Sequence, residues 1–325
     1  MIQTVTNPAI ELLLDQCTDL ELKVSVDRVE ENELVVIGPL GERICVDLSP
    51  GKCSMIEQVL QKLVIHFKEL PLLTIGESKE IRLLTPKISL ARLIPTVYSF
   101  THNRYGEAPG TDLIRARFSA EIFRTVACQP GYHFLSTAFI GLIESLEGPL
   151  LAEHVVDPGN IEVRVKRYHI GSPLHRYLYT ERYPTKSNGP SLVRWSRFID
   201  PVICFDWRHP LKDEEGKWLA DEPLSDDYAG VWIDNIVRAK QLAKHMFEWL
   251  EYLFASKGLL LIDICFFIDK TGTVIFGEIS PDCMRVRSGA ADDAESLDKD
   301  QWRLGHNASD VLDHYTKLYN ILFKP

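Results

Sequence analysis

The feature that most constrains the fold is an apolar run, LLLIDICFFIDKTGTVIFGEIS, at residues 259–280. Two short apolar stretches flank the turn-forming residues DKTG, and this pattern predicts a β-hairpin. Because side chains alternate between the two faces of a strand, Asp263, Cys265 and Phe267 share one face. Asp263 is the sole charge in the first strand, so it needs a partner or a functional site; an Asp263 that faces solvent or pairs with a nearby base is the alternative.

Charged side chains gather directly after the hairpin, in GEISPDCMR at residues 277–285. Pro281 ends the strand pairing, so the loop that follows can direct Asp282 and Arg285 into a cleft at the strand end, beside Glu278. The planar fork of arginine suits a carboxylate or a phosphate. A surface cluster of salt bridges is the alternative explanation, and composition alone favours it.

Basic side chains gather in a third stretch, VKRYHIGSPLHRY, around Gly171 and Ser172. Glycine allows the backbone to approach an anion, and a serine hydroxyl at a helix N-terminus can bind phosphate. A basic loop on an otherwise acidic protein is an equally good explanation. The basic residues of the stretch are Lys166, Arg167, His169, His175 and Arg176.

Residues 1–70 predict a small α+β unit. Apolar and polar residues alternate through LELKVSVDRVEENELVVIGPLGERICVDL, which indicates strands separated by turns. Apolar residues at helical spacing then continue as far as Phe67. Ser54 is the expected N-cap of this helix, and Glu57 stands three residues later in a capping-box arrangement.

The rest of the chain is predicted to contain both strands and helices. PLLTIGESKEIRLL predicts two strands joined by a glycine turn, and NIVRAKQLAKHMFEWLEYLFASKG predicts a long helix that ends at Gly258. TDLIRARFSAEIFRTVA and SDVLDHYTKLYNILF predict two further helices. Residues 183–230 contain several Pro, Gly and Asp residues, and we expect them to be irregular and exposed.

Composition limits the partners and the compartment. The 325 residues include 36 Lys and Arg against 46 Asp and Glu, a net charge of −10; such a surface disfavours nucleic acid and anionic membranes but leaves room for a local basic pocket. The apolar runs are far shorter than the ~20 residues of a membrane span, and the first residues do not resemble a secretory signal. The 7 cysteines form no CxxC pair, so we expect reduced thiols in a cytoplasmic protein rather than a zinc site.

Taken together, these stretches resemble the SAICAR synthetase family, the phosphoribosylaminoimidazole-succinocarboxamide synthases. The family signature has the form L/I-L/I/V-D-x-K-x-E-F, a turn, then D-E-x-S/T-P-D-x-x-R, and the chain has LIDICFFI, a turn and GEISPDCMR. VKRYHIGSPLHRY is similar to the family's VRN-x-x-x-GS-x-x-x-R, and LDKDQWRLG at residues 297–305 is similar to its DKD-x-F/W-R. Order and spacing agree across roughly residues 71–322, whereas residues 1–70 have no counterpart.

The resemblance implies an α+β fold of two lobes. A small antiparallel lobe, at residues 71–160 here, would cover ATP with a Gly-rich turn, and a larger α+β lobe, at residues 161–325, would hold the nucleotide substrate. In the family, ATP and magnesium activate the carboxylate of a phosphoribosyl aminoimidazole (CAIR), and the amine of aspartate then attacks the acyl phosphate to form an amide.

The residues that the resemblance assigns to the substrate are largely retained. Ser172 matches the serine that contacts the substrate phosphate, and Arg285 matches the arginine of SPDxxR, which also holds the nucleotide. Lys166 stands in place of an arginine, so the charge is kept but the planar fork is lost. The other predicted substrate-binding residues are Arg167, Arg176, Lys299 and Arg303, and Glu278, Ser280 and Asp282 also have counterparts.

The residues that the resemblance assigns to ATP and magnesium are largely replaced. Cys265 stands in place of a lysine, Phe267 and Gly277 in place of two magnesium-binding carboxylates, and Glu77 in place of a lysine of the Gly-rich turn. Magnesium with nucleotide phosphates needs carboxylate oxygens, and a glutamate beside a triphosphate repels it. We therefore expect a linked loss of ATP and magnesium use, with no metal site. Two residues of the turn remain as cofactor-binding candidates, Gly76 and Lys79.

Three functions stay open. The first is an enzyme that converts a phosphoribosyl-imidazole carboxylate or carboxamide nucleotide by ATP-independent cyclisation or dehydration, in the biosynthesis of purine-like nucleosides of the coformycin or pentostatin type. The second is an ATP-dependent ligase that takes metal ligands from Asp263 and Glu278. The third is a non-catalytic ribotide-binding protein with residues 1–70 as its interaction module, and a homo-oligomer is compatible with all three. The catalytic candidates are Asp263, Glu278, Asp282 and, more weakly, Cys265.

Overall fold

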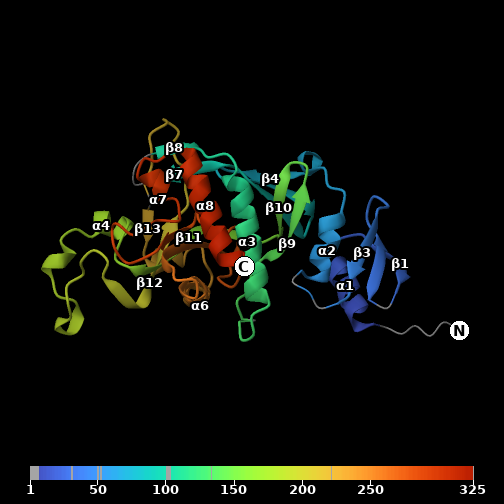
Figure 1. The fold of residues 1–325 in the computed structure, drawn as a ribbon, viewed down its shortest axis with the longest axis horizontal. Helices are drawn as coiled ribbons and strands as arrows, with labels where there is room; N and C mark the ends of the chain where they lie inside the picture. The colour runs from blue at the N-terminus through green and yellow to red at the C-terminus, as the bar shows by residue number, and fades with distance from the viewer. Residues whose placement is uncertain are drawn as a thin grey trace. The chain divides into compact units, whose positions relative to one another are not determined.

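The computed structural model describes residues 7–30, 32–49, 51, 53–99, 104–132, 134–220 and 222–324. The chain (Figure 1) divides into two compact units: unit 1 combines Met1–Ile94 with Ala116–Val156, and unit 2 combines Pro95–Arg115 with Asp157–Pro325. Helices accompany antiparallel sheets in the structure, which confirms the predicted α+β class. Within the described residues, none of the helices is long and apolar enough to span a membrane.

Unit 1 is built on two antiparallel sheets, one with the strand order β1-β2-β3 and one with the order β4-β5-β6-β10-β9. Helix α3 (Thr111–Ala127) has its first residues in unit 2 and continues in unit 1. The glycine turn predicted in PLLTIGESKEIRLL joins β4 to β5. The other elements of this unit are α1 (Pro8–Asp19), β1 (Ser25–Val29), β2 (Glu33–Ile37), β3 (Arg43–Asp47), α2 (Met55–Lys62), the 3-10 turn η1 (Phe67–Glu69), β4 (Leu72–Ile75), β5 (Lys79–Thr85), β6 (Ile88–Leu93), β9 (Phe139–Ser145) and β10 (Gly148–His154).

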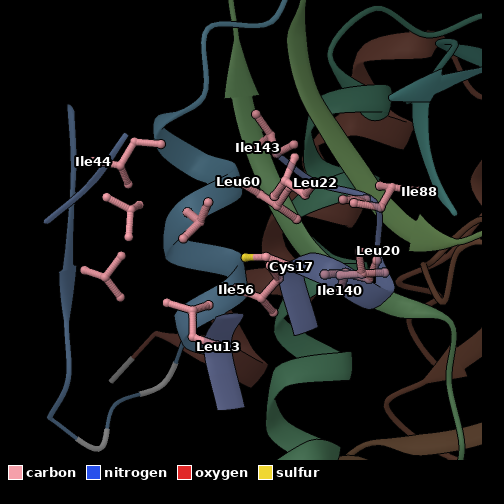
Figure 2. Close-up of a cluster of buried hydrophobic side chains, with 14 of the residues drawn as sticks. Leu13, Cys17, Leu20, Leu22, Ile44, Ile56, Leu60, Ile88, Ile140 and Ile143 are labelled. Carbon is pink, nitrogen blue, oxygen red and sulfur yellow. The ribbon is translucent and has the colours of Figure 1, made fainter. Parts of the chain in front are cut away.

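One hydrophobic core joins α1 and α2 to the second sheet of unit 1. Leu13 of α1 and Leu60 of α2 are fully buried in it, together with side chains of β9 and β10. Figure 2 shows α2 between the strand that carries Ile44 and the strand that carries Ile140 and Ile143. The core therefore includes side chains from both sides of residue 70, and the predicted division of the chain into three domains stays a prediction.

Helix α2 begins where the sequence predicts and ends earlier. The Ser54 hydroxyl accepts a hydrogen bond from the backbone N–H of Glu57 at 3.2 Å, which confirms Ser54 as the N-cap. The helix ends at Lys62, and Phe67 belongs to the separate turn η1, so the helical spacing of apolar residues overstates its length. The Glu57 carboxylate is buried in an ion pair with Arg124 of α3. The buried ion pair with Arg124, rather than a capping box, therefore explains the position of the Glu57 carboxylate.

Unit 2 is built on an antiparallel sheet with the order β13-β12-β11-β14-β15, and β16 pairs with β14. The long hairpin predicted from the apolar run is confirmed as β14 and β15. The elements of this unit are β7 (Thr96–Ser99), β8 (Arg104–Glu107), β11 (Pro158–Tyr168), α4 (Ser172–Arg176), η3 (Thr180–Arg182), η4 (Lys186–Asn188), β12 (Arg197–Trp207), β13 (Glu222–Leu224), α5 (Asp226–Ala229), α6 (Ile236–Ala255), β14 (Leu260–Asp269), β15 (Ile275–Phe276), β16 (Met284–Arg287), α7 (Asp300–Arg303) and α8 (Ala308–Phe323).

The prediction that residues 183–230 are irregular and exposed is wrong for their central part. They contain β12, which pairs with β11 along most of its length and with β13 on its other side. Phe205 of β12 is fully buried. The Asp and Pro in RFIDPVICFDW obscure the alternation of apolar residues, and hydrogen bonds to β11 supply the strand conformation that local propensity does not indicate.

The two faces of the unit 2 sheet differ in character. Helix α6 packs against β11, β12 and β14, and buried apolar residues such as Val163, Val165, Ile262 and Ile264 alternate with polar ones along these strands. The helix ends at Ala255, three residues before the predicted Gly258, whose φ of +73° lies in the turn that follows. Strand alternation therefore directs the polar residues of β11 and β14 to the face opposite those apolar side chains.

Candidate functional site

The polar face of the unit 2 sheet consists of three cross-strand rows. In the first row, Lys166 of β11 lies opposite Asp263 of β14; in the second, Arg164 lies opposite Cys265; in the third, Glu162 lies opposite Phe267. Strand β16 brings Arg285 opposite Asp263, next to the first row. The predicted common face of Asp263, Cys265 and Phe267 is thus confirmed, and the structure adds the partners from β11 and β16.

Asp263 forms the centre of the first row. It is 4% exposed and binds both the Lys166 ammonium and the Arg285 guanidinium, whose Nη1 lies 2.7 Å from its Oδ2. Burial alone would raise the pKa of Asp263, but the charges of Arg285 and Lys166 outweigh it and hold the pKa below its usual value. Asp263 is therefore an ionised group that orients two cations, and it is poorly suited to donate a proton.

Gly171 is required by the position of Arg285. Its backbone has φ +77°, and a Cβ at this position would lie 2.8 Å from the guanidinium carbon of Arg285. Glycine thus permits both the backbone conformation and the close approach of the cation. Gly171 precedes Ser172, the first residue of α4; the side chains of Ser172 and His175 lie outside the described residues. The backbone of the predicted phosphate-binding turn lies directly against Arg285.

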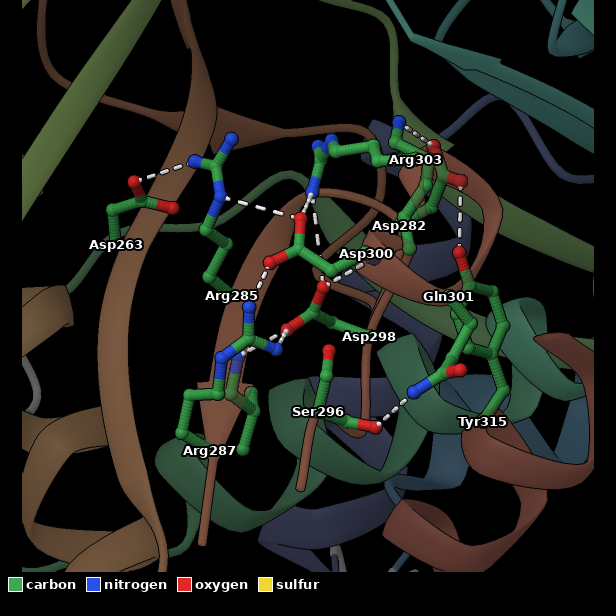
Figure 3. Close-up of polar contacts among 12 residues, drawn as sticks. Asp263, Asp282, Arg285, Arg287, Ser296, Asp298, Asp300, Gln301, Arg303 and Tyr315 are labelled. Atoms are coloured by element: carbon green, nitrogen blue, oxygen red, sulfur yellow. Dashed lines mark hydrogen bonds and ion pairs between the residues drawn. The ribbon is translucent and has the colours of Figure 1, made fainter. Parts of the chain in front are cut away.

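A network of charges extends from Arg285 to the DKD segment (Figure 3). Arg285 Nε lies 3.5 Å from Oδ1 of Asp300, which also binds Arg287 and Arg303. Asp298 is fully buried beside it and accepts the backbone N–H of Val286 at 2.7 Å. Burial and the neighbouring charge of Asp300 raise the pKa of Asp298 to about 6. The predicted residues Arg285 and Arg303 are therefore brought together through Asp300.

The second row contains the thiol of Cys265, which is partly exposed. Arg164 Nε lies 3.4 Å from the Cys265 sulfur, and its Nη2 lies 3.1 Å from Oδ2 of Asp206 on β12. Arg176 of α4 reaches the other oxygen of Asp206 at 3.4 Å. Burial raises the pKa of Cys265 to about 12, so the thiol is neutral at physiological pH and gives no support to a nucleophilic role.

The third row places an arginine over an aromatic ring. The Arg208 guanidinium lies 4.2 Å from the ring centroid of Phe267, and Phe276 of β15 packs beside the same ring at 5.8 Å. Arg208 also lies 3.9 Å from Glu162. These side chains do not fit a magnesium ion, because Phe267 has no ligand oxygen and Arg208 adds a like charge.

Glu278 and Asp282 occupy a neighbouring cluster. Glu278 is 4% exposed and receives two hydrogen bonds from Arg115, at 2.9 and 2.6 Å, and one from the Ser280 hydroxyl at 2.7 Å. Asp282 binds Lys299 at 2.9 Å and the Tyr315 hydroxyl at 3.0 Å. Burial would raise the pKa of Asp282, but the charges of Lys299 and Arg115 lower it to about 2. Each carboxylate is therefore paired with a cation of the protein, Glu278 with Arg115 and Asp282 with Lys299.

Three other predicted residues have different surroundings, each within its own unit. Arg167 follows Lys166 on β11 and points to the opposite face, where it binds Glu251 of α6 at 2.7 and 2.6 Å. In unit 1, Gly76 lies in the turn between β4 and β5 and Lys79 is the first residue of β5; the Gly76 N–H donates to the Lys79 carbonyl at 2.9 Å. Their predicted role toward ATP stays a prediction.

The sequence interpretation missed four residues that hold the predicted ones. Arg164 stands two residues before Lys166, so the period of a strand alone could have placed it on the polar face. Asp206 and Arg208 lie in the segment that the sequence predicts to be irregular. Arg115 comes from α3, far from Glu278 in the sequence, and no local pattern links the two.

Comparison with known proteins gives consistent matches. The family model described as SAICAR synthetase matches residues 97–318. The chain is 24% identical over 312 residues to the bifunctional cordycepin biosynthesis cluster protein 3 of Cordyceps militaris, covering 79% of the chain and 34% of that protein. It is 33% identical over 227 residues to the phosphoribosylaminoimidazole-succinocarboxamide synthase of Pyrococcus horikoshii, covering 68% of the chain and 82% of that protein.

The solved structures agree on the fold. A SAICAR synthetase (type 2) in complex with ADP matches with a TM-score of 0.61 and 22% identity, covering 78% of the chain and 97% of that structure. The chain spans only about a third of the Cordyceps protein, and 57% of the corresponding synthases of Methanocaldococcus jannaschii and Methanoregula boonei.

Proposed function

The chain belongs to the SAICAR synthetase family, and on that premise we propose that it binds a phosphoribosyl-imidazole carboxylate or carboxamide nucleotide on the polar face of the unit 2 sheet. We propose further that it converts this ribotide without ATP, by cyclisation or dehydration, in the biosynthesis of purine-like nucleosides. The cordycepin cluster protein among its relatives supports a role in nucleoside biosynthesis.

The observation that carries the proposal is the Arg285 site. Lys166, Arg285 and Asp263 form a group of two cations and one carboxylate, which leaves one positive charge beside the Gly171 turn. A phosphate monoester at this turn would meet backbone N–H groups and the arginine fork. The carboxylate of Asp263 fixes both cations in position before the ligand arrives, so little reorganisation accompanies binding.

The carboxylates of the site are suited to orientation and electrostatics. Asp263 and Asp282 have lowered pKa values, so at neutral pH both stay ionised and can stabilise positive charge that develops on an imidazole ring. Proton transfer would then require groups of the ribotide itself or a bound water. A cyclisation or dehydration driven by fixed charges is consistent with this arrangement.

A second candidate is the ATP-dependent ligation of aspartate to the imidazole carboxylate. The Pyrococcus synthase at 33% identity and the retained Gly76 turn with Lys79 favour it. The third row disfavours it, because Phe267 stands at a position that the resemblance assigns to a metal ligand and Arg208 lies over its ring.

The decisive experiment incubates the protein with CAIR and aspartate, with and without ATP and magnesium, and measures ADP release and product mass. We expect ribotide binding in calorimetry without ADP release. Arg285→Gln should abolish binding, whereas Arg194→Gln, which alters an exposed pair with Asp292, should leave it unchanged. Stoichiometric ADP release would establish the ligase instead, and binding without any product in the presence of the pathway's other enzymes would indicate a non-catalytic protein.

A further inference from the structure

The polar face carries more positive charge than its own carboxylates neutralise. Among the described residues, its side chains on β11, β12, β14, β16 and α4, with the residue that follows β12, supply five cations against three carboxylates. The cations are Arg164, Lys166, Arg176, Arg208 and Arg285, and the carboxylates are Glu162, Asp206 and Asp263. Asp300, which also contacts Arg285, is shared with Arg287 and Arg303 and does not alter this excess.

The excess is divided between the two ends of the face. Asp263 offsets one of the two cations at the first row, and Asp206 and Glu162 offset two of the three cations at the second and third rows. Counted over the residues that the structure describes, each end therefore keeps about one positive charge. Lys166 at the first end and Glu162 at the second lie four positions apart on β11, a distance of roughly 13 Å at about 3.3 Å per residue. This arrangement matches a ligand in which a ribose carries a phosphate at one end and a five-membered ring with a carboxylate at the other.

Arg208 is the most exposed of the three cations counted at the second end. Its side chain is 37% exposed, against 20% for Arg176 and 9% for Arg164. A guanidinium over an aromatic ring uses its face for that contact, and all five of its N–H donors lie in the guanidinium plane. Its ion pair with Glu162 is loose at 3.9 Å. The Phe267 ring thus contacts the face of the Arg208 guanidinium, and the N–H donors at its edge keep the geometry that a carboxylate binds.

We propose that Arg208, seated on Phe267 and backed by Arg164, binds the carboxylate of the ligand directly and without a metal ion. This cation then determines the preference for carboxylated over uncarboxylated imidazole ribotides. The proposal rests on the proposed function for the identity of the ligand, and it adds the residue that selects it. The same arrangement explains why Cys265 stands in place of a lysine and Phe267 in place of a metal ligand. Arg164 of β11 and Arg208 after β12 supply the positive charge next to these two positions.

The test compares three probes by calorimetry in buffer containing EDTA: CAIR, the uncarboxylated aminoimidazole ribotide, and imidazole-4-carboxylate. We expect CAIR to bind roughly 10- to 100-fold more tightly than the uncarboxylated ribotide, the range for a hydrogen-bonded charged group. Arg208→Gln should remove this preference and leave the affinity for the uncarboxylated ribotide unchanged. Arg208→Lys, which keeps the charge without the fork, should retain part of it.

The matched control is Arg117→Gln, because Arg117 is similarly exposed, at 45%, and pairs with Glu144 on the surface of unit 1. Equal affinities for the two ribotides, or an equal loss of both in Arg208→Gln, would overturn the inference while leaving ribotide binding intact. If neither ribotide binds, the proposed function fails, and the inference is then tested by the binding of imidazole-4-carboxylate alone. Binding of that probe that is lost in Arg208→Gln would support it, and the absence of such binding would overturn it.

Discussion

Replacing Asp263 with asparagine should destabilise the protein by about 3–5 kcal/mol, the usual effect of removing one partner from a buried ion pair. The substitution keeps the side-chain volume but removes the charge that two cations share. Asp263 is 4% exposed and Lys166 is 2% exposed, and the Arg285 contact is 2.7 Å long, so water cannot substitute for the carboxylate. A loss of this size is a large part of a folding stability of about 5–15 kcal/mol.

Urea unfolding followed by circular dichroism measures this difference. Asp200→Asn is the matched control, because Asp200 binds Lys244 at 3.2 Å but its side chain is 84% exposed, and such pairs contribute about 0–1 kcal/mol. The double change Asp263→Leu with Lys166→Met should recover much of the loss, since an apolar pair leaves fewer buried charges unpaired. A cost for Asp263→Asn as small as that of Asp200→Asn would refute the reasoning, because it would mean that water enters the polar face.

The same contact gives a pH dependence with a definite sign. The pKa of Asp263 is lower in the folded protein than in the unfolded chain, so the unfolded chain binds the proton more readily. The stabilisation is therefore complete at neutral pH and is lost as the pH falls below about 4, the pKa of an unperturbed aspartate. Asp263→Asn should remove this part of the acid dependence.

Three further predictions follow from the site. Cys265 should react with a thiol reagent at pH 7.5 at least about 100-fold more slowly than the exposed Cys128, because the pKa of Cys265 is about 12. Mass spectrometry of labelled peptides measures both rates, and similar rates would contradict the raised pKa of Cys265. Asp298 has a raised pKa of about 6, so its folded form binds the extra proton and stability falls by about 2–3 kcal/mol as the pH rises from about 4 to about 6; Asp298→Asn should flatten that part of the pH profile in urea unfolding. Gly171→Ala should cost about 1–3 kcal/mol, because φ is +77° and the new Cβ would displace Arg285; a variant of unchanged stability with unchanged ribotide affinity would show that the turn adapts.

Local periodicity was sufficient to predict the hairpin that carries Asp263, Cys265 and Phe267. The alternation in LLLIDICFFI placed Asp263, Cys265 and Phe267 on one face, and the turn residues after them predicted the hairpin that the structure contains. Strands and capped helices are stabilised by neighbours in the sequence, so their patterns are visible without a fold. The same reasoning failed for β12, because its strand conformation depends on pairing with β11.

The sequence by itself determined which side chains share a face, and only the tertiary structure decided which charges neutralise one another. Lys166 and Asp263 meet because β11 and β14 pair in one particular register, and a shift of one residue would direct them to opposite faces. Arg115 reaches Glu278 from a helix 163 positions away in the chain, and Arg208 reaches Phe267 through the pairing of β12 with β11. Charge partners in a buried site are chosen by long-range packing, because the energy of each pair depends on distance and on the exclusion of water.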